Sequence, residues 1–189
     1  MRDIKKEEYL GGAIAISRHI SEFCNNISLL SMVGEKGEFL KNILKNLPKN
    51  VDFRYIKKKN SPTIIKKRFL DNSTNNNNKI LGVYTINDDL LIRGDEKKFA
   101  KLLKKEISNH DLIIISDYGH GLISDKSAKS ICKKSLFLAL NAQVNASNIG
   151  YHTMDKYKNV ECVVINETEL RHETRNKSSP IKLLMKKFS

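Results

Sequence analysis

A carboxylate and two glycines follow a run of apolar residues near the middle of the chain. The stretch Leu112–Ser124, LIIISDYGHGLIS, passes from four apolar residues into Asp117 and Tyr118, with Gly119 and Gly121 close behind. A carboxylate at the end of a strand can accept hydrogen bonds from ligand hydroxyl groups or act as a base. It can equally cap the next helix or bind loop amides. The stretch therefore marks a candidate binding site with a structural alternative.

Two weaker signals lie in this stretch and near the N-terminus. His120 stands between the two glycines and could titrate near neutral pH, although we expect an ordinary solvated loop histidine. Gly11 and Gly12 precede a predicted helix, where missing side chains let backbone amides approach a ligand. A Gly-Gly pair is more often only a turn, so this pair alone does not define a site.

The segment VVINETEL holds a third candidate, because Asn166 and Glu169 follow a predicted strand and open a predicted helix. Residues three apart share a helix face, so this amide and carboxylate could together orient water around a magnesium ion and phosphates. The alternative is a capping box, which also requires Asn at the N-cap and Glu three residues later. The spacing does not separate the two interpretations.

The elements that must position these residues alternate between strands and helices. Apolar residues at helical spacing predict helices, and short apolar runs predict strands covered on both faces. We expect Asp95 to cap a helix that buries Phe99 and Ile107, and Pro180 to lie in the first turn of a C-terminal helix. Helices are predicted at 11–24, 37–48, 95–107, 124–134, 167–173 and 179–189, and strands at 27–34, 111–116, 136–140 and 160–165. This order predicts an α/β fold, a Rossmann-like and mostly parallel sheet flanked by helices.

The middle of the chain has a different pattern. Three strand-like runs at 51–56, 63–70 and 79–86 follow one another without a helix between them, and the polar turn DNSTNNNN at 71–78 joins the last two. They predict a small antiparallel sheet outside the parallel one, a β lid over 51–87. An isolated sheet of this size leaves an apolar face to be covered.

Length and composition favour one soluble domain. The chain has 189 residues, 40% of them hydrophobic and 29% charged, with a mean hydropathy of -0.44. No apolar stretch approaches the roughly 18 residues of a membrane span, and the N-terminus has no signal-peptide core, so we expect a cytoplasmic protein and no membrane partner. Cys24, Cys132 and Cys162 are too widely spaced for a zinc site, and we expect reduced core thiols.

The net charge of +13 raises the question of a polyanionic partner. The lysines are spread along the chain, aromatic residues are only 7%, and no basic run carries interleaved aromatic residues. Nucleic acid is therefore not an expected partner. The sequence contains no P-loop, G-x-G-x-x-G, G-x-S-x-G or zinc signature.

Taken in order, YLGGAIAISRHI, LLSMVGEKGEF, the lid strands, DLIIISDYGHG and VVINETEL resemble the ribokinase-like (PfkB) carbohydrate kinase family, and most of all its heptose-phosphate kinase branch. The resemblance runs from about Tyr9 to Leu170. It implies ATP-dependent phosphorylation of a sugar or sugar phosphate on a ribokinase-like fold, with ATP and Mg²⁺ as cofactors. It also implies sugar binding by Gly11, Gly12, Asp117, Tyr118 and Gly121, and magnesium and phosphate binding by Asn166 and Glu169.

The chain departs from the family's pattern in several places. Ala15 stands where relatives carry the asparagine of G-G-A-x-N, and His120 where they often carry the lysine of D-Y-x-K-G. The G-A-G-D signature, with the catalytic aspartate and the anion hole, is absent, as is the strand that precedes the glycine pair. We therefore assign no catalytic residue and expect a single kinase domain over 1–189 that is truncated at both ends.

Three functions follow from these observations. The first is a sugar kinase domain, inactive as this chain alone or completed by another polypeptide that carries G-A-G-D. The second is a non-catalytic sugar-phosphate-binding or scaffolding module, because the base is missing. The third is a polyanion-binding protein, because of the charge. Among relatives the β lid often forms a dimer, so we also expect a homodimer through it. Nucleotide transfer is not assigned, since the H-x-G-H motif of the accompanying domain is absent.

Overall fold

The fold is taken from a computed structural model that describes residues 5–71, 78–144 and 152–188. Two parallel sheets are flanked by helices, and a small antiparallel sheet accompanies them, which confirms the predicted α/β, Rossmann-like fold class. The chain divides into two compact units, residues 1–86 and 87–189. The single kinase domain expected over 1–189 stays a prediction. Each unit is described by itself below.

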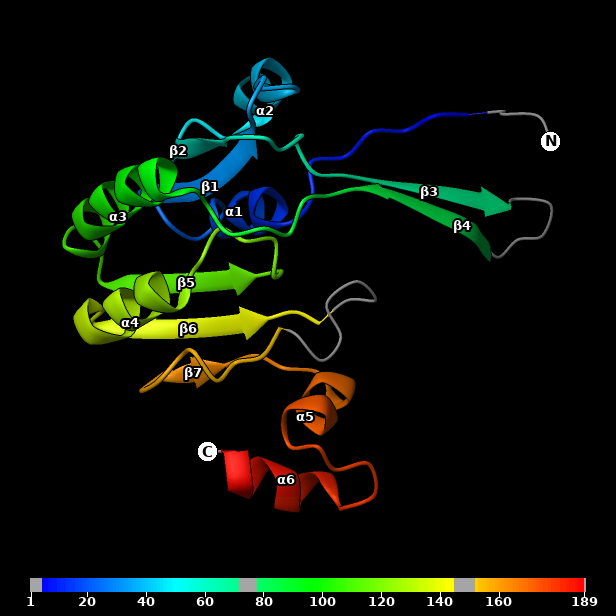
Figure 1. The fold of residues 1–189 in the computed structure, drawn as a ribbon, viewed down its shortest axis with the longest axis vertical. Coiled ribbons are helices and arrows are strands. Elements are labelled where there is room, and N and C mark those ends of the chain that lie inside the picture. Colours follow the sequence, from blue (N-terminus) through cyan, green and yellow to red (C-terminus); the bar gives the residue numbers. More distant parts are fainter. Residues whose placement is uncertain (1–4, 72–77, 145–151, 189) are drawn as a thin grey trace. The chain divides into compact units, whose positions relative to one another are not determined.

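The first unit contains a strand-helix-strand crossover (Figure 1). Strand β1 (Ile27–Gly34) follows helix α1 (Ala13–Ile20), and helix α2 (Leu40–Asn46) leads into strand β2 (Val51–Lys58). β1 and β2 pair in parallel along their whole length. Apolar residues from both strands and α2 form a small core, namely Leu29, Val33, Ile43, Val51 and Ile56.

The first unit also carries an antiparallel hairpin of strands β3 (Ile65–Asp71) and β4 (Asn78–Thr85). The predicted lid of three strands over 51–87 is therefore wrong for its first strand, because β2 pairs with β1 instead. The physical reason is the preceding helix, since a crossover through α2 returns the chain parallel to β1. The lid consists of β3 and β4, and residues 72–77 of the predicted turn lie outside the described residues.

The second unit contains a parallel sheet in the order β5-β6-β7. Its strands are β5 (Leu112–Asp117), β6 (Phe137–Ala142) and the short β7 (Cys162–Val163), where a strand over 160–165 was predicted. Its helices are α3 (Arg93–Ile107), α4 (Asp125–Lys134), α5 (Glu167–Glu173) and α6 (Ile181–Phe188). α3 packs against α4 (Figure 1). The core includes Phe99, Ile115, Ile131, Leu138 and Leu140.

Helix ends and exposed positions differ in detail from expectation. The Ser124 side chain caps α4 by accepting the N–H of Ser127. Asp95 does not cap α3, because the N-cap is Ile92 and Asp95 lies buried in the first turn, where it pairs with Lys98. Cys24 is exposed rather than in the core.

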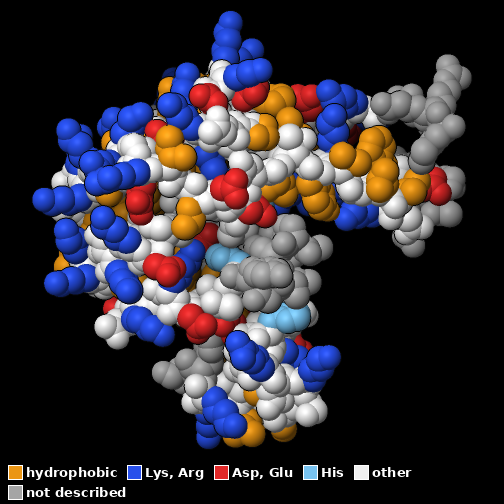
Figure 2. Space-filling view, viewed as in Figure 1, with side chains coloured by type: hydrophobic (Ala, Val, Ile, Leu, Met, Phe, Trp, Pro, Cys, Tyr) orange, Lys and Arg blue, Asp and Glu red, His pale blue; other side chains and the backbone are white. Residues whose placement is uncertain are grey.

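Basic side chains are numerous on the face of the molecule drawn in Figure 2. Figure 2 shows Lys and Arg side chains over α3 and α4, whereas hydrophobic side chains gather on the β3–β4 hairpin. No helix in the described part of the chain is long and apolar enough to span a membrane.

Candidate functional site

The end of β5 places the carboxylate of Asp117 inside the second unit. The apolar residues of β5 pair with β6 along the whole strand, so the chain turns away from the sheet directly after Asp117. Asp117 is only 6% exposed. Its Oδ1 accepts the N–H of Gly119 at 3.0 Å, and its Oδ2 accepts the hydroxyl of Tyr157 at 2.6 Å. The Lys156 ammonium lies 2.7 Å from the same Oδ2.

His152 completes this cluster of buried polar groups. Its Nε2 lies 3.2 Å from the backbone oxygen of Asp117 and 3.8 Å from Oδ2. The N–H of Gln143, just after β6, donates to the same backbone oxygen at 2.8 Å. Strand β6 and the segment before β7 therefore both hold the last residue of β5. We refer to Asp117, His152, Lys156 and Tyr157 as the Asp117 cluster.

The cluster keeps Asp117 charged. Burial alone would raise the pKa of its carboxyl group, but the charge and hydrogen bond of Lys156, the hydrogen bond of Tyr157 and the charge of His152 together hold the pKa below its ordinary value. Burial and the neighbouring Asp117 charge raise the pKa of the Tyr157 phenol, so this group stays protonated and donates. A buried carboxylate with these partners is an acceptor that fixes the surrounding chain.

The loop after Asp117 is held in one conformation by its glycines. Gly119 and Gly121 have φ values of 69° and 79°, which side chains rarely adopt. The carbonyl oxygen of Gly121 accepts the N–H of Leu91 at 3.2 Å, and a Cβ on Gly121 would lie 1.9 Å from the backbone oxygen of Asp89. The predicted Gly121 thus serves a close approach of two chain segments.

His120 is not the solvated loop histidine that we expected. It is 7% exposed, and its Nδ1 lies 2.7 Å from Asp88 Oδ1. Its ring also stacks with that of Tyr118, with centroids 6.3 Å apart. The segment with Asp88 and Asp89 covers the loop, and this burial is the physical reason for the difference. Tyr118, which was predicted to bind sugar, is half-buried and follows the buried Asp117 in the chain.

Asn166 and Glu169 form a capping box at the start of α5. Asn166 Oδ1 accepts the N–H of Glu169 at 2.9 Å, and the N–H of Asn166 donates to Glu169 Oε2 at 3.1 Å. The Glu169 side chain is buried, whereas Asn166 is exposed. The structural alternative that the spacing left open is therefore present, and the proposed role in magnesium and phosphate binding stays a prediction. Among the described residues, no group of three or more His, Cys, Asp or Glu could hold a metal ion.

Gly11 and Gly12 lie in the first unit, before α1. Gly12 is the N-cap of α1 with a φ of 59°, and its carbonyl oxygen accepts the N–H of Ile16 at 3.2 Å. A Cβ on Gly11 would meet nothing within 4 Å. The glycine pair and the Asp117 cluster belong to different units, so a sugar site that uses both stays a prediction.

Sequence reasoning missed His152, Lys156 and Tyr157. They stand 35 to 40 residues after Asp117, in the irregular segment between β6 and β7. They lie outside the predicted helices and strands and belong to no recognised motif, so no local signal marks them. The one available hint is that a buried carboxylate at a strand end requires a cationic or hydrogen-bonding partner.

Comparison with known proteins finds distant similarity to two bifunctional proteins named HldE. The chain is 25% identical to HldE of a Nitratiruptor species over 134 residues, which are 70% of this chain and 28% of that protein. It is 24% identical to HldE of Campylobacter curvus over 173 residues, 90% of this chain and 35% of that protein. The chain thus spans about a third of the length of these relatives. No protein-family model matches it.

Proposed function

We propose that this chain is a sugar kinase-like protein that binds a sugar or sugar phosphate at the carboxyl end of β5 and takes part in its ATP-dependent phosphorylation. One observation carries the proposal: the similarity to HldE of Campylobacter curvus extends over 90% of the chain. Distant similarity of this kind supports a sugar kinase-like relationship. The mixed parallel fold agrees with it, because ligands of open parallel sheets bind at the carboxyl ends of the strands.

The geometry supports a positioning role for Asp117 rather than a role as the base. Its two carboxylate oxygens already accept from Gly119 and Tyr157 and face Lys156. A proton acceptor for a sugar hydroxyl needs a free approach to that hydroxyl. In this proposal Asp117 fixes the loop, and the half-buried Tyr118 and the loop backbone contact the sugar.

ATP and Mg²⁺ are the proposed cofactors. Asn166 is the residue of this chain that we propose to contact them. The Asn166 side chain is exposed, and its carbonyl oxygen has a second lone pair beyond the capping bond. The buried Glu169 acts through Asn166 by accepting its N–H. Mg²⁺ typically keeps several waters, so such a site needs few protein ligands. The bound ion would neutralise charge on the transferring phosphoryl group.

Catalysis also needs a base and an anion hole, and the G-A-G-D segment that the family resemblance places in this role does not occur in the sequence. We therefore propose that phosphorylation requires a polypeptide that supplies this segment. The non-catalytic alternative, a sugar-phosphate-binding module, keeps the same β5 site without transfer.

The decisive experiment measures ATP consumption with a panel of sugars and sugar phosphates. The chain is assayed alone and mixed with a polypeptide that carries G-A-G-D, and the expected result is turnover in the mixture. Thermal stabilisation by the same compounds, and by ATP with Mg²⁺, is measured in parallel. Stabilisation by sugar phosphates without turnover in either sample supports the binding module. Absence of both turnover and stabilisation contradicts the proposal.

A homodimer through the β3–β4 hairpin is a second part of the proposal. The pairing register places Ile65, Phe69, Leu81 and Val83 on one face together with Lys67 and Thr85, and we call this the apolar hairpin face. Phe69, Leu81 and Val83 are 44%, 53% and 45% exposed. Exposed apolar side chains gather over the hairpin in Figure 2, and such a patch typically marks an interaction surface.

Sedimentation or light scattering tests the dimer. The double change Leu81→Ser with Val83→Ser should produce a monomer, because it removes the centre of the apolar hairpin face. Leu183→Ser with Met185→Ser, at exposed positions of α6, is the matched control and should leave the oligomeric state unchanged. A native chain that is monomeric at all concentrations contradicts this part of the proposal.

Polyanion binding is the remaining alternative, and it rests on the net charge of +13. It predicts retardation of DNA or RNA at low salt, with an affinity that falls steeply as salt is added. Failure to retard either nucleic acid at low salt removes this alternative.

A further inference from the structure

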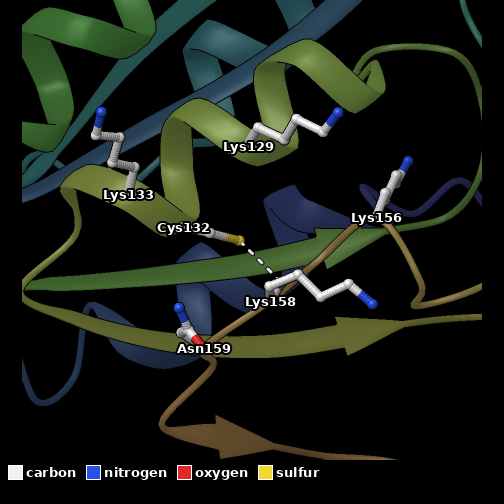
Figure 3. Close-up of a pocket in the computed structure, with 6 residues that line it drawn as sticks. All are labelled: Lys129, Cys132, Lys133, Lys156, Lys158 and Asn159. Carbon is white, nitrogen blue, oxygen red and sulfur yellow. Dashed lines mark hydrogen bonds between the residues drawn. The ribbon is translucent and has the colours of Figure 1, made fainter.

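A basic cavity lies between helix α4 and the segment that precedes β7. It has a volume of about 220 Å³ and is lined by Lys129, Cys132 and Lys133 of α4 and by Lys156, Lys158 and Asn159 of that segment (Figure 3). The Cys132 sulfur points toward the segment and accepts the N–H of Lys158 at 3.4 Å. Four of the six lining residues are lysines, and none is acidic.

The lysines of this cavity differ in their partners, and Lys129, Lys133 and Lys158 are exposed to solvent. Lys156 is committed elsewhere, since its ammonium contacts Asp117 Oδ2 at 2.7 Å and the backbone oxygen of Ile123 at 2.8 Å. Within the described residues, no ion pair joins Lys129, Lys133 or Lys158 to a carboxylate. Like charges held around one cavity repel one another, and a bound anion would remove that cost.

The local structure explains why these residues line the same cavity. Lys129, Cys132 and Lys133 are spaced i, i+3 and i+4, so they share one face of α4. Lys133 lies in the last turn, where a cation complements the helix dipole. This ordinary role accounts for Lys133 but not for Lys129, one turn earlier, or for Lys158 on the facing segment.

We propose that this cavity binds a small phosphate-bearing anion, held by Lys129, Lys133 and Lys158 beside the Asn159 amide. The cavity adjoins the Asp117 cluster through Lys156, but the proposed anion contacts are other residues, and the proposal does not depend on the proposed kinase function. Its volume is below the roughly 300–1,000 Å³ of pockets for drug-sized ligands, so it suits a single phosphate group rather than a whole nucleotide. Lysine ammonium groups bind phosphate as point charges, without the fixed geometry that arginine imposes.

The first test is protection of Cys132 from alkylation in the native protein. Cys132 and Cys162 are both partly exposed, and only Cys132 lines the cavity, so Cys162 is an internal reference. Inorganic phosphate at ten times its Kd leaves about a tenth of the sites empty, so iodoacetamide labelling of Cys132 should slow about tenfold. Labelling of Cys162 should not change. Mass spectrometry of the two peptides measures both rates.

The second test measures the affinity for inorganic phosphate by calorimetry at low ionic strength, where screening is weak. The triple change Lys129→Gln, Lys133→Gln and Lys158→Gln should weaken binding by about tenfold or more. The control removes the same charge at exposed positions of α3 with Lys97→Gln, Lys101→Gln and Lys105→Gln, and should bind phosphate as the native chain does.

Three results would overturn the proposal. They are no measurable phosphate binding, an equal loss in the α3 control, and equal slowing of Cys132 and Cys162 labelling. The second of these results, an equal loss in both triple variants, would indicate that the overall charge attracts phosphate, as expected for a nucleic acid-binding surface. Because both tests use phosphate alone, their failure leaves the proposed kinase function untouched.

Discussion

Two acidic groups, Asp117 at the end of β5 and Glu169 at the start of α5, are each engaged in a different way. Glu169 is engaged by Asn166, three residues away, in a motif that closes on itself. Asp117 is engaged by Tyr157, 40 residues away, and by Lys156 beside it. The first arrangement stabilises one helix end, whereas the second joins β5 to the segment before β7. The contrast separates a local cap from a group that joins distant parts of the chain, and four measurements test it.

The largest expected effect is that of Asp117→Asn. This change leaves the Lys156 ammonium, whose side chain is 16% exposed, without its carboxylate. Removing one partner of a buried ion pair costs about 3–5 kcal/mol of unfolding free energy. Urea denaturation measures the loss, and Asp111→Asn at an exposed position should change stability by less than about 0.5 kcal/mol. Equal losses of unfolding free energy in the two variants would show that the Asp117 cluster does not stabilise the fold more than an exposed aspartate does.

Tyr157→Phe removes the hydroxyl that donates to Asp117 but keeps the buried ring. A hydrogen bond to a charged group contributes about 1.5–3 kcal/mol, and this loss is expected in the same denaturation assay. Tyr9→Phe, at a side chain that is 81% exposed, is the control. The double variant with Asp117→Asn should lose less than the sum of the two single losses, because both changes remove the same contact. If the loss of unfolding free energy in the double variant equals the sum of the two single losses, Tyr157 and Asp117 do not share this contact.

The acid dependence of stability gives a third comparison. Because the folded state holds the pKa of Asp117 below the ordinary value of 3.8, the stabilisation is complete above that pH. It is lost as the pH falls further, through the lower pKa of the folded state. One such group contributes a slope of at most about 1.4 kcal/mol per pH unit. Unfolding free energies measured across this acid range should show a shallower slope for Asp117→Asn than for the native chain, and identical slopes would refute the assignment.

The smallest effect is expected from Asn166→Ala, which removes the N-cap side chain of α5. Loss of such a cap costs about 1 kcal/mol, and Asn166→Asp, which keeps a capping oxygen, should restore most of it. Thermal stabilisation by ATP with Mg²⁺ is the second readout. If only stability falls, the box is a cap alone; if the nucleotide effect also disappears with Asn166→Ala, the residue serves both roles.

The elements and the capping box could be predicted from the sequence because their causes are local. Apolar periodicity placed β1 and β5 nearly to the residue, and the spacing of Asn166 and Glu169 admitted the box that is present. The pairing of β2 with β1 was missed although the helix between them argued for a parallel partner. The burial of His120 was missed because its partner Asp88 lies 32 residues earlier, beyond any local pattern.

The close approach at Gly121 has a consequence for protein engineering. Its backbone lies against Asp89 with no room for a side chain, and it is bonded to Leu91. The stretches 87–91 and 117–121 therefore form a seam between parts of the chain about thirty residues apart. In a chimera built with a relative, exchanging only the loop after β5 would place a foreign loop against the native stretch 87–91, and the close contact between the two stretches would no longer fit. Both stretches have to be transplanted together.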